Sequence, residues 1–204
     1  MEQLYPKLIY TINTEKQLLS PKDFKETEIE VIWNLSNNPT IEFLNFANQN
    51  NLFPICTIVN NINSKASIGI YLDEPNEKTL LQKIEELKRK NKETIVICDC
   101  KNSYDLAMLA GDAGADVIAF KYQDNLEELL SLLETWNNLT VIQSLLLADH
   151  MNEEELNKCL ASGIDFIAFP QTFNINSNNR VEKIQKINNL LKKYPFQATN
   201  FNEE

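Results

Sequence analysis

The sequence has little glycine, one histidine and no long apolar run. Its 204 residues include four glycines and a single histidine, His150. One histidine argues against a metal site built on several imidazoles and against a histidine-based triad, so we give His150 an ordinary loop role. No stretch reaches the roughly 20 apolar residues that cross a bilayer, and the first residues lack a basic-then-apolar leader. We therefore expect a cytoplasmic protein with no membrane partner.

Cysteine and positive charge are also sparse. Four cysteines in 204 residues do not look like a disulfide framework, and the spacing of Cys98 and Cys100 in one predicted strand suits neither a disulfide nor a zinc site. We therefore expect buried free thiols at Cys56, Cys98, Cys100 and Cys159. The net charge is −10, and the short basic runs 88–90 and 192–193 fall near the ends of predicted helices. Such a charge balance argues against a nucleic-acid partner.

Apolar strand-like segments alternate with helix-like segments along almost the whole chain. The predicted strands are 8–12, 30–35, 53–60, 67–72, 93–100, 116–122, 140–147 and 165–171. The predicted helices are 40–50, 78–90, 103–113, 125–136, 153–161 and 180–193, with Ser103 and Asn152 as N-caps. The strands are continuous apolar runs, a pattern typical of parallel strands that are covered on both faces.

Eight strands alternating with helices predict a single (β/α)8 barrel over residues 1–195, followed by a flexible tail, 196–204. A doubly wound open sheet is the alternative, but its phosphate loop normally contains glycine, and the segment 11–20 has none. An internal repeat favours the barrel. Residues 113–120 (AGADVIAF) match residues 162–169 (SGIDFIAF), two βα units further along the chain.

The segment 102–120 (NSYDLAMLAGDAGADVIAF) resembles the thiamine phosphate synthase family, which includes the TenI-type thiazole tautomerases. The resemblance is diffuse but covers most of the chain, including the opening strand and the second glycine–aspartate turn at residues 163–165. It implies a (β/α)8 barrel that joins a pyrimidine pyrophosphate to a thiazole phosphate, with magnesium.

The sequence departs from the family pattern after its second and third strands. The family's Gln-Leu-Arg-x-Lys segment for pyrophosphate is replaced by residues 33–37 (WNLSN), which contain no cation. The magnesium-binding Val-Asn-Asp-Arg segment is replaced by residues 59–62 (VNNI), which contain no carboxylate. The asparagines that remain at these places, Asn34, Asn60 and Asn61, are our candidates for substrate contacts.

The ends of later strands have also lost the family's charged and phosphate-binding residues. Asp73 and Glu74 follow the fourth strand, shifted from the family's acidic position, and are weak candidates for a metal site beside the simpler interpretation of a helix-capping turn. The loop after the sixth strand is shortened and leaves Lys121, while Gln171 follows Pro170 after the last strand. We include Lys121 and Gln171 among the substrate-binding candidates.

Asp99 and Lys101 lie at the predicted end of the fifth strand. A carboxylate and an amine at a barrel mouth form either a structural ion pair or an acid–base couple, so these two residues are weak catalytic candidates.

We interpret the chain as a divergent member of the family that has lost the parental condensation and binds a small, phosphorylated ligand or a protein. Two alternatives remain, an active thiamine phosphate synthase, which is a transferase of thiamine biosynthesis, and another barrel lyase or isomerase. We predict no cofactor, or magnesium if the family activity is retained, and leave a homo-oligomer open. If the site is degenerate, we expect Trp33, Leu145 or Phe169 to fill the mouth.

Overall fold

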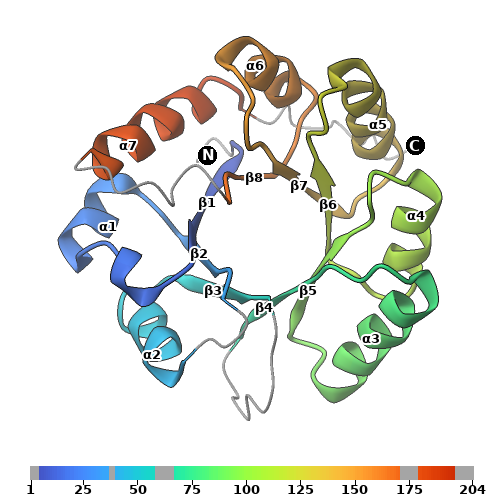
Figure 1. Ribbon diagram of the computed structural model, residues 1–204, viewed down its shortest axis with the longest axis horizontal. Helices are drawn as coiled ribbons and strands as arrows, with labels where there is room; N and C mark the ends of the chain where they lie inside the picture. Colours follow the sequence, from blue (N-terminus) through green and yellow to red (C-terminus); the bar gives the residue numbers. More distant parts are fainter. Residues whose placement is uncertain (1–4, 37–39, 58–66, 171–178, 196–204) are drawn as a thin grey trace, which may run out of the picture.

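The computed structural model describes residues 5–36, 40–57, 67–170 and 179–195. Its parallel strands pair in sequence order and close into a barrel, because the last strand pairs with the first (Figure 1). The chain is therefore a (β/α)8 TIM barrel, as the sequence predicts. The strands are β1 (Lys7–Ile12), β2 (Val31–Asn34), β3 (Phe53–Cys56), β4 (Gly69–Leu72), β5 (Ile95–Asp99), β6 (Val117–Lys121), β7 (Gln143–Leu147) and β8 (Phe166–Ala168).

The helices surround the barrel as an outer ring (Figure 1). They are α1 (Pro21–Thr27), α2 (Ile41–Gln49), α3 (Glu77–Lys90), α4 (Tyr104–Asp112), α5 (Leu126–Leu139), α6 (Glu153–Ala161) and α7 (Arg180–Leu191), with a short 3-10 helix at Glu15–Gln17. The helix α1, which is one of the shortest, is not among the helices that the sequence predicts. The predicted tail, 196–204, lies outside the described residues, as does the segment between 58 and 66 that links β3 to β4.

Side-chain caps begin most of these helices. The Ser103 hydroxyl accepts a hydrogen bond from the backbone N–H of Leu106, and Asn152 accepts one from Glu155. Both caps were predicted, and each satisfies a donor that the first helical turn would leave unpaired. In α1 the same role belongs to Ser20, with proline as the first helical residue.

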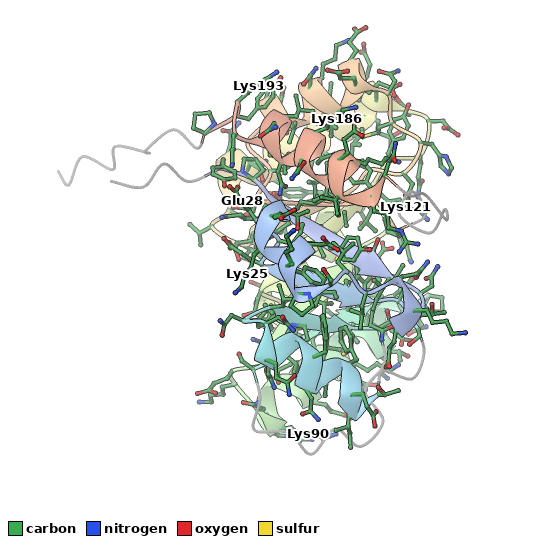
Figure 2. The ribbon with its side chains drawn as sticks, turned by 90° about the vertical axis from the view of Figure 1, so that its left-hand side faces the viewer. Lys25, Glu28, Lys90, Lys121, Lys186 and Lys193 are labelled. Carbon is green, nitrogen blue, oxygen red and sulfur yellow. The ribbon has the colours of Figure 1, made fainter. Side chains whose placement is uncertain are left out.

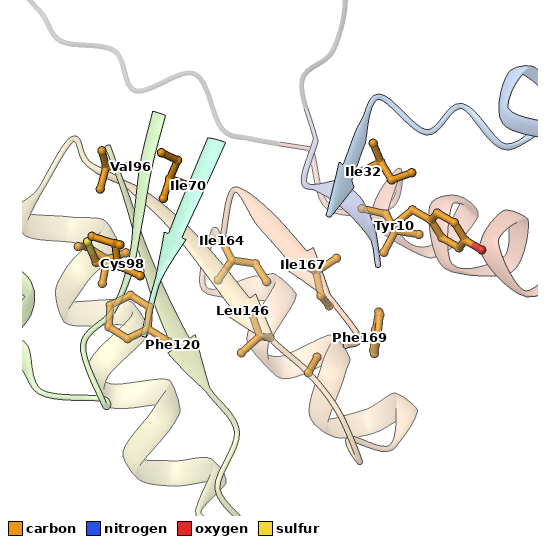
Figure 3. Packing of buried hydrophobic residues seen from close by; sticks show 14 of the residues in the cluster. Tyr10, Ile32, Ile70, Val96, Cys98, Phe120, Leu146, Ile164, Ile167 and Phe169 are labelled. Carbon is orange, nitrogen blue, oxygen red and sulfur yellow. The ribbon is translucent and has the colours of Figure 1, made fainter. Parts of the chain in front are cut away.

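Two apolar layers hold the barrel together. The larger lies between the strands and the helices and includes Tyr10, Phe120, Leu146 and Phe169 (Figure 3). The smaller lies inside the barrel, where alternate residues of the strands meet, and is made of Ile9, Trp33, Ile55, Tyr71, Ile97, Val117, Ala119, Leu145, Leu147 and Ala168. Burial on both strand faces explains why the strands read as continuous apolar runs.

The two copies of the internal repeat have the same structural role. In each copy the aspartate that precedes a strand accepts a backbone N–H from the neighbouring strand. Asp116 accepts from Val96 at 2.7 Å, and Asp165 accepts from Ser144 at 2.8 Å. The repeated glycine–aspartate turn thus ties β5 to β6 and β7 to β8 at their N-terminal ends, away from the mouth of the barrel.

Within the described residues, none of the helices combines the length and the apolarity that a membrane crossing requires.

Candidate functional site

Polar side chains gather where β4 and β5 end, at the C-terminal mouth of the barrel. Leu72 pairs with Cys98 in the register of these strands, so the residues that follow, Asp73 and Asp99, are neighbours. A hydrogen bond joins the Tyr71 and Asp99 side chains, and ion pairs join Lys101 to both Asp73 and Asp99. We call Tyr71, Asp73, Asp99 and Lys101 the β4–β5 cluster.

Asp99 is the buried centre of this cluster, since its side chain is only 7% exposed. The Tyr71 hydroxyl donates a hydrogen bond of 3.1 Å to Asp99 Oδ2, and the backbone N–H of Lys101 donates one of 2.8 Å to Asp99 Oδ1. The Lys101 ammonium lies 3.3 Å from Asp99 Oδ2. A carboxylate held by three donors has a fixed position, as a site residue requires.

Lys101 forms an ion pair with each of the two carboxylates, Asp73 and Asp99. Partial burial lowers the pKa of Lys101, but the hydrogen bond to Asp73 and the charge of Asp99 outweigh it, so the pKa is raised above 10.5. Lys101 is therefore an ammonium at neutral pH and not a nucleophilic amine. With two carboxylates and one ammonium, the cluster has a net negative charge.

Tyr71 supplies a neutral hydroxyl to the cluster. Burial raises the pKa of Tyr71 well above 10.0, and the negative charges of Asp99 and Asp73 raise it further. The phenol therefore keeps its proton across the ordinary pH range and acts as a hydrogen-bond donor to Asp99.

The backbone is strained where β5 ends. Lys101 and Asn102 are consecutive non-glycine residues in the left-handed region, with φ of 54° and 57°. The Asn102 side chain holds this turn against β6, because it donates to the Lys121 carbonyl at 2.7 Å and accepts from the Lys121 N–H at 2.9 Å. Such strain persists only where the surroundings fix the backbone, and it is common at functional sites.

Below the cluster the barrel is filled by side chains. The rings of Trp33 and Tyr71 lie 4.4 Å apart between centroids, and the Trp33 indole N–H donates to the Thr57 hydroxyl at 3.1 Å. Leu145 and Leu147 belong to the same buried group. We call Trp33, Tyr71, Leu145 and Leu147 the central layer. Trp33 and Leu145, expected to fill the mouth of a degenerate site, lie in the barrel interior below the β4–β5 cluster.

Phe169 does not, and its predicted place in the mouth is wrong. It belongs to the layer between strands and helices, together with Ile167 (Figure 3). Strand residues alternate between faces, so Ala168 points inward and Phe169 outward.

The other predicted site residues are scattered. Asn34 is buried on the same strand face as Ile32, and its side chain accepts the Ser36 N–H, a local turn contact. Glu74 forms an ion pair with Lys83, away from the Asp73–Lys101 pair. These contacts do not bring Asn34 or Glu74 into the β4–β5 cluster.

Lys121 ends β6 on the mouth side, where its side chain is exposed (Figure 2). The candidates Asn60, Asn61 and Gln171 lie outside the described residues. Tyr71 was missed as a site residue. Its spacing of two puts it on the same strand face as Asp73, but the sequence does not show that this face points inward.

The donors needed for a metal ion do not converge in the described part of the chain. No group of three or more histidine, cysteine, aspartate and glutamate side chains is placed to hold a metal there. Asp73 and Asp99 face a shared lysine, which occupies the position that a divalent cation would need. The described residues therefore do not fit a magnesium site at this part of the mouth.

A hollow of about 640 Å³ lies outside the barrel, between α6 and α7. Its lining includes His150, Lys183, Lys186 and Lys193. Lys186 is exposed and pairs with Glu182 on its own helix. This hollow is a groove between two helices, and its lining includes lysines of α7 and the N-terminal turn of α6.

A closed parallel barrel with fixed polar groups at the C-terminal ends of its strands defines the class as a TIM barrel, in which this end normally carries the active site. No family model and no curated protein matches the chain. Among solved structures, it is similar to thiamine phosphate pyrophosphorylase from Pyrococcus furiosus, with 13% identity, a TM-score of 0.67, and coverage of 93% of this chain and 96% of that one.

Other barrel enzymes are similar to a comparable degree. The YdjI aldolase from Escherichia coli K12 has 10% identity and a TM-score of 0.67, with 93% of this chain and 92% of that one covered. A 2,3-dimethylmalate lyase has 11% identity and a TM-score of 0.59, with 97% and 87% covered. At these identities the similarity shows the fold alone.

Proposed function

We propose that this protein is a divergent thiamine phosphate synthase-like barrel that has lost the condensation of a pyrimidine pyrophosphate with a thiazole phosphate, and that its mouth binds a small ligand. One observation carries the proposal. The Lys101 ammonium is paired with Asp73 and Asp99, and these two carboxylates oppose its attraction for a phosphate.

The charge balance supports this proposal. Transfer of a group from pyrophosphate requires cations or amide donors around the leaving group, and each lost donor costs about 2–4 kcal/mol of transition-state stabilisation. The β4–β5 cluster presents net negative charge to the mouth, and Lys121 is the cation at the end of β6. A phosphorylated ligand would meet repulsion from the cluster, whereas a neutral or amine-bearing ligand would meet fixed acceptors.

The condensation assay tests the loss directly. Purified protein would be incubated with magnesium and both phosphorylated substrates, beside an active thiamine phosphate synthase. We expect no thiamine phosphate above the level without protein. Product formation at a rate comparable to the active enzyme would contradict the proposal and support the active transferase instead.

Thermal shift tests the ligand class. The same pyrimidine and thiazole would be offered as phosphate esters and as unphosphorylated alcohols, since a ligand that binds the native state raises the melting temperature. We expect stabilisation only from unphosphorylated compounds. Stabilisation only by the phosphate esters would contradict the proposed charge preference.

The strained turn after β5 favours a second candidate function, that of a lyase or isomerase. Consecutive left-handed residues hold Lys101 beside the buried Asp99 carboxylate. In this function Asp99 is the base, and Lys101 stabilises the negative charge that develops on the substrate. Proton exchange of small carbonyl compounds with deuterated water, compared between the native protein and Asp99→Asn, tests this role. Equal exchange in both proteins would exclude it.

A further inference from the structure

The opposite end of the barrel has a cavity with different chemistry. Its volume is about 230 Å³. The described residues that line it are Ile9, Val31, Phe53, Ile55, Ile95, Ile97, Val117, Gln143 and Phe166. Most of them are the first residues of their strands, so the cavity opens at the N-terminal end of the barrel. We call it the N-terminal cavity.

Figure 2 shows the two ends from the side. Lys121, at the end of β6, lies toward the right of the view, and Glu28, just before β2, lies toward the left. The mouth therefore faces right and the N-terminal cavity opens on the left.

The lining of the N-terminal cavity is apolar almost throughout. Ile9, Ile55 and Ile97 form a buried floor, and Gln143 is the polar side chain among the described lining residues. Phe53 and Phe166 at the rim are half-buried. An apolar cavity of this kind does not hold water well, since a water molecule needs several polar partners.

The cavity exists partly because β4 adds no side chain at this level. Gly69 lies in register with Ile55 and Ile95, both of which line the cavity. A Cβ at position 69 would lie 2.9 Å from Ile55 Cγ1, so Gly69 faces inward. The interior of a TIM barrel is normally filled by layers of side chains, and here the first layer is incomplete.

The N-terminal cavity is separate from the mouth. The central layer lies between them, and its members Trp33, Tyr71 and Leu145 are at most 6% exposed. A molecule in the cavity therefore does not reach the β4–β5 cluster.

We propose that the N-terminal cavity binds a small apolar molecule of about the size of a substituted benzene. The surrounding ring of strands limits the width of the occupant, which excludes a helix. A cavity of about 150 Å³ lined by aliphatic and aromatic side chains is large enough for benzene. Among the described lining residues none is charged and Gln143 offers an uncharged amide, so burial of an ionised molecule of the same shape is disfavoured.

Toluene and benzoate are the probes, because they share a ring and differ by a charge. Titration of methyl-labelled protein with toluene is expected to shift the methyl signals of Ile9, Ile55 and Ile97, with a dissociation constant on the order of 0.1–1 mM. The Ile184 methyls, buried between strands and helices, are the internal control and are expected not to shift. Benzoate is expected to shift none of these signals.

Two filling variants test the place of binding. Val31→Phe and Ile95→Phe each enlarge a side chain of the lining, from different strands, and each is expected to weaken toluene binding at least tenfold. Ile41→Phe is the matched control, since Ile41 is 73% exposed at the start of α2, which lies at the opposite end of the barrel. Circular dichroism establishes that each variant is folded. If a variant does not fold, the titration of the native protein still tests the proposal.

The proposal is overturned if toluene shifts no floor methyl, if benzoate binds as well as toluene, or if both folded filling variants bind toluene as the native protein does. A doubled mass in light scattering, with no toluene binding, would instead assign the opening to a contact between two copies.

Discussion

The Tyr71 hydroxyl donates a hydrogen bond of 3.1 Å to the Asp99 carboxylate across the boundary between β4 and β5. This contact connects the buried interior of the barrel to its polar mouth. Asp99 is buried, so its carboxylate needs the hydrogen-bond donors that surround it.

Tyr71→Phe removes that hydroxyl and leaves the ring. We expect the free energy of unfolding to fall by about 1–2 kcal/mol, because a buried carboxylate loses one of its donors. Urea denaturation measures the change. Tyr104→Phe is the control, since it also deletes a hydroxyl while keeping a ring that packs against Trp136. Equal decreases in the free energy of unfolding of the two variants would show that the Tyr71–Asp99 hydrogen bond contributes no more to stability than the Tyr104 hydroxyl does.

Asp73→Asn should release Lys101 from one of its two carboxylates. We expect inorganic pyrophosphate to bind about three- to tenfold more tightly than to the native protein, since the cluster loses one negative charge close to the ammonium. Calorimetric titration at low salt measures the affinity. Glu74→Gln removes the same charge from a residue that pairs with Lys83 and not with Lys101, so it should raise the affinity by a smaller factor. An unchanged affinity in Asp73→Asn would argue that the Asp73–Lys101 pair does not limit anion binding.

The cysteines should be unreactive in the folded protein. All four are buried, and burial raises the pKa of Cys56, Cys100 and Cys159 to about 12. The reactive thiolate is therefore scarce at pH 8, and access is blocked as well. A colorimetric disulfide reagent should label less than one thiol per chain in buffer and all four in guanidinium. Rapid labelling of the native protein would contradict this burial.

Asp165 should make stability depend on pH. Burial raises the pKa of Asp165 above 3.8, and the hydrogen bonds from Ser144 offset this only in part. The folded state thus keeps its proton to a higher pH than the unfolded state, so the contribution of Asp165 is complete below about pH 3.8 and is lost as pH rises through the folded-state pKa.

Asp165→Asn is expected to remove the decrease in stability that accompanies rising pH, while keeping an oxygen that accepts the Ser144 N–H. Urea denaturation from pH 3 to pH 7 measures the free energy of unfolding of both proteins. Asp116→Asn is the matched control from the other copy of the repeat, where Lys88 provides a counter-charge. If the pH profiles of native protein and Asp165→Asn coincide, the titration of Asp165 does not influence folding.

The barrel could be predicted because its signals are local and repeated. Apolar runs alternate with capped amphipathic helices, and the structure confirms Ser103 and Asn152 as caps. The helix α1 was missed because it is short, although Ser20 followed by Pro21 is a start signal that could have revealed it.

The candidate site was predicted less completely, because the sequence does not show which face of each strand points into the barrel. Asp99 and Lys101 were chosen because they end a strand, and the structure brings them together with Asp73. Asn34 was chosen in the same way but points toward the helices. Strands that are apolar on both faces do not record which face is inward, so the sequence could not distinguish these cases.

The central layer separates the polar mouth of the barrel from the apolar N-terminal cavity. Trp33 and Tyr71 pack against each other there, with no polar path from one opening to the other among the described residues. Residues at one end of the barrel can therefore change without altering ligand binding at the other end. Substitutions that change the charge of the mouth should leave occupancy of the apolar end untouched, and sequence drift at either end is free to proceed independently.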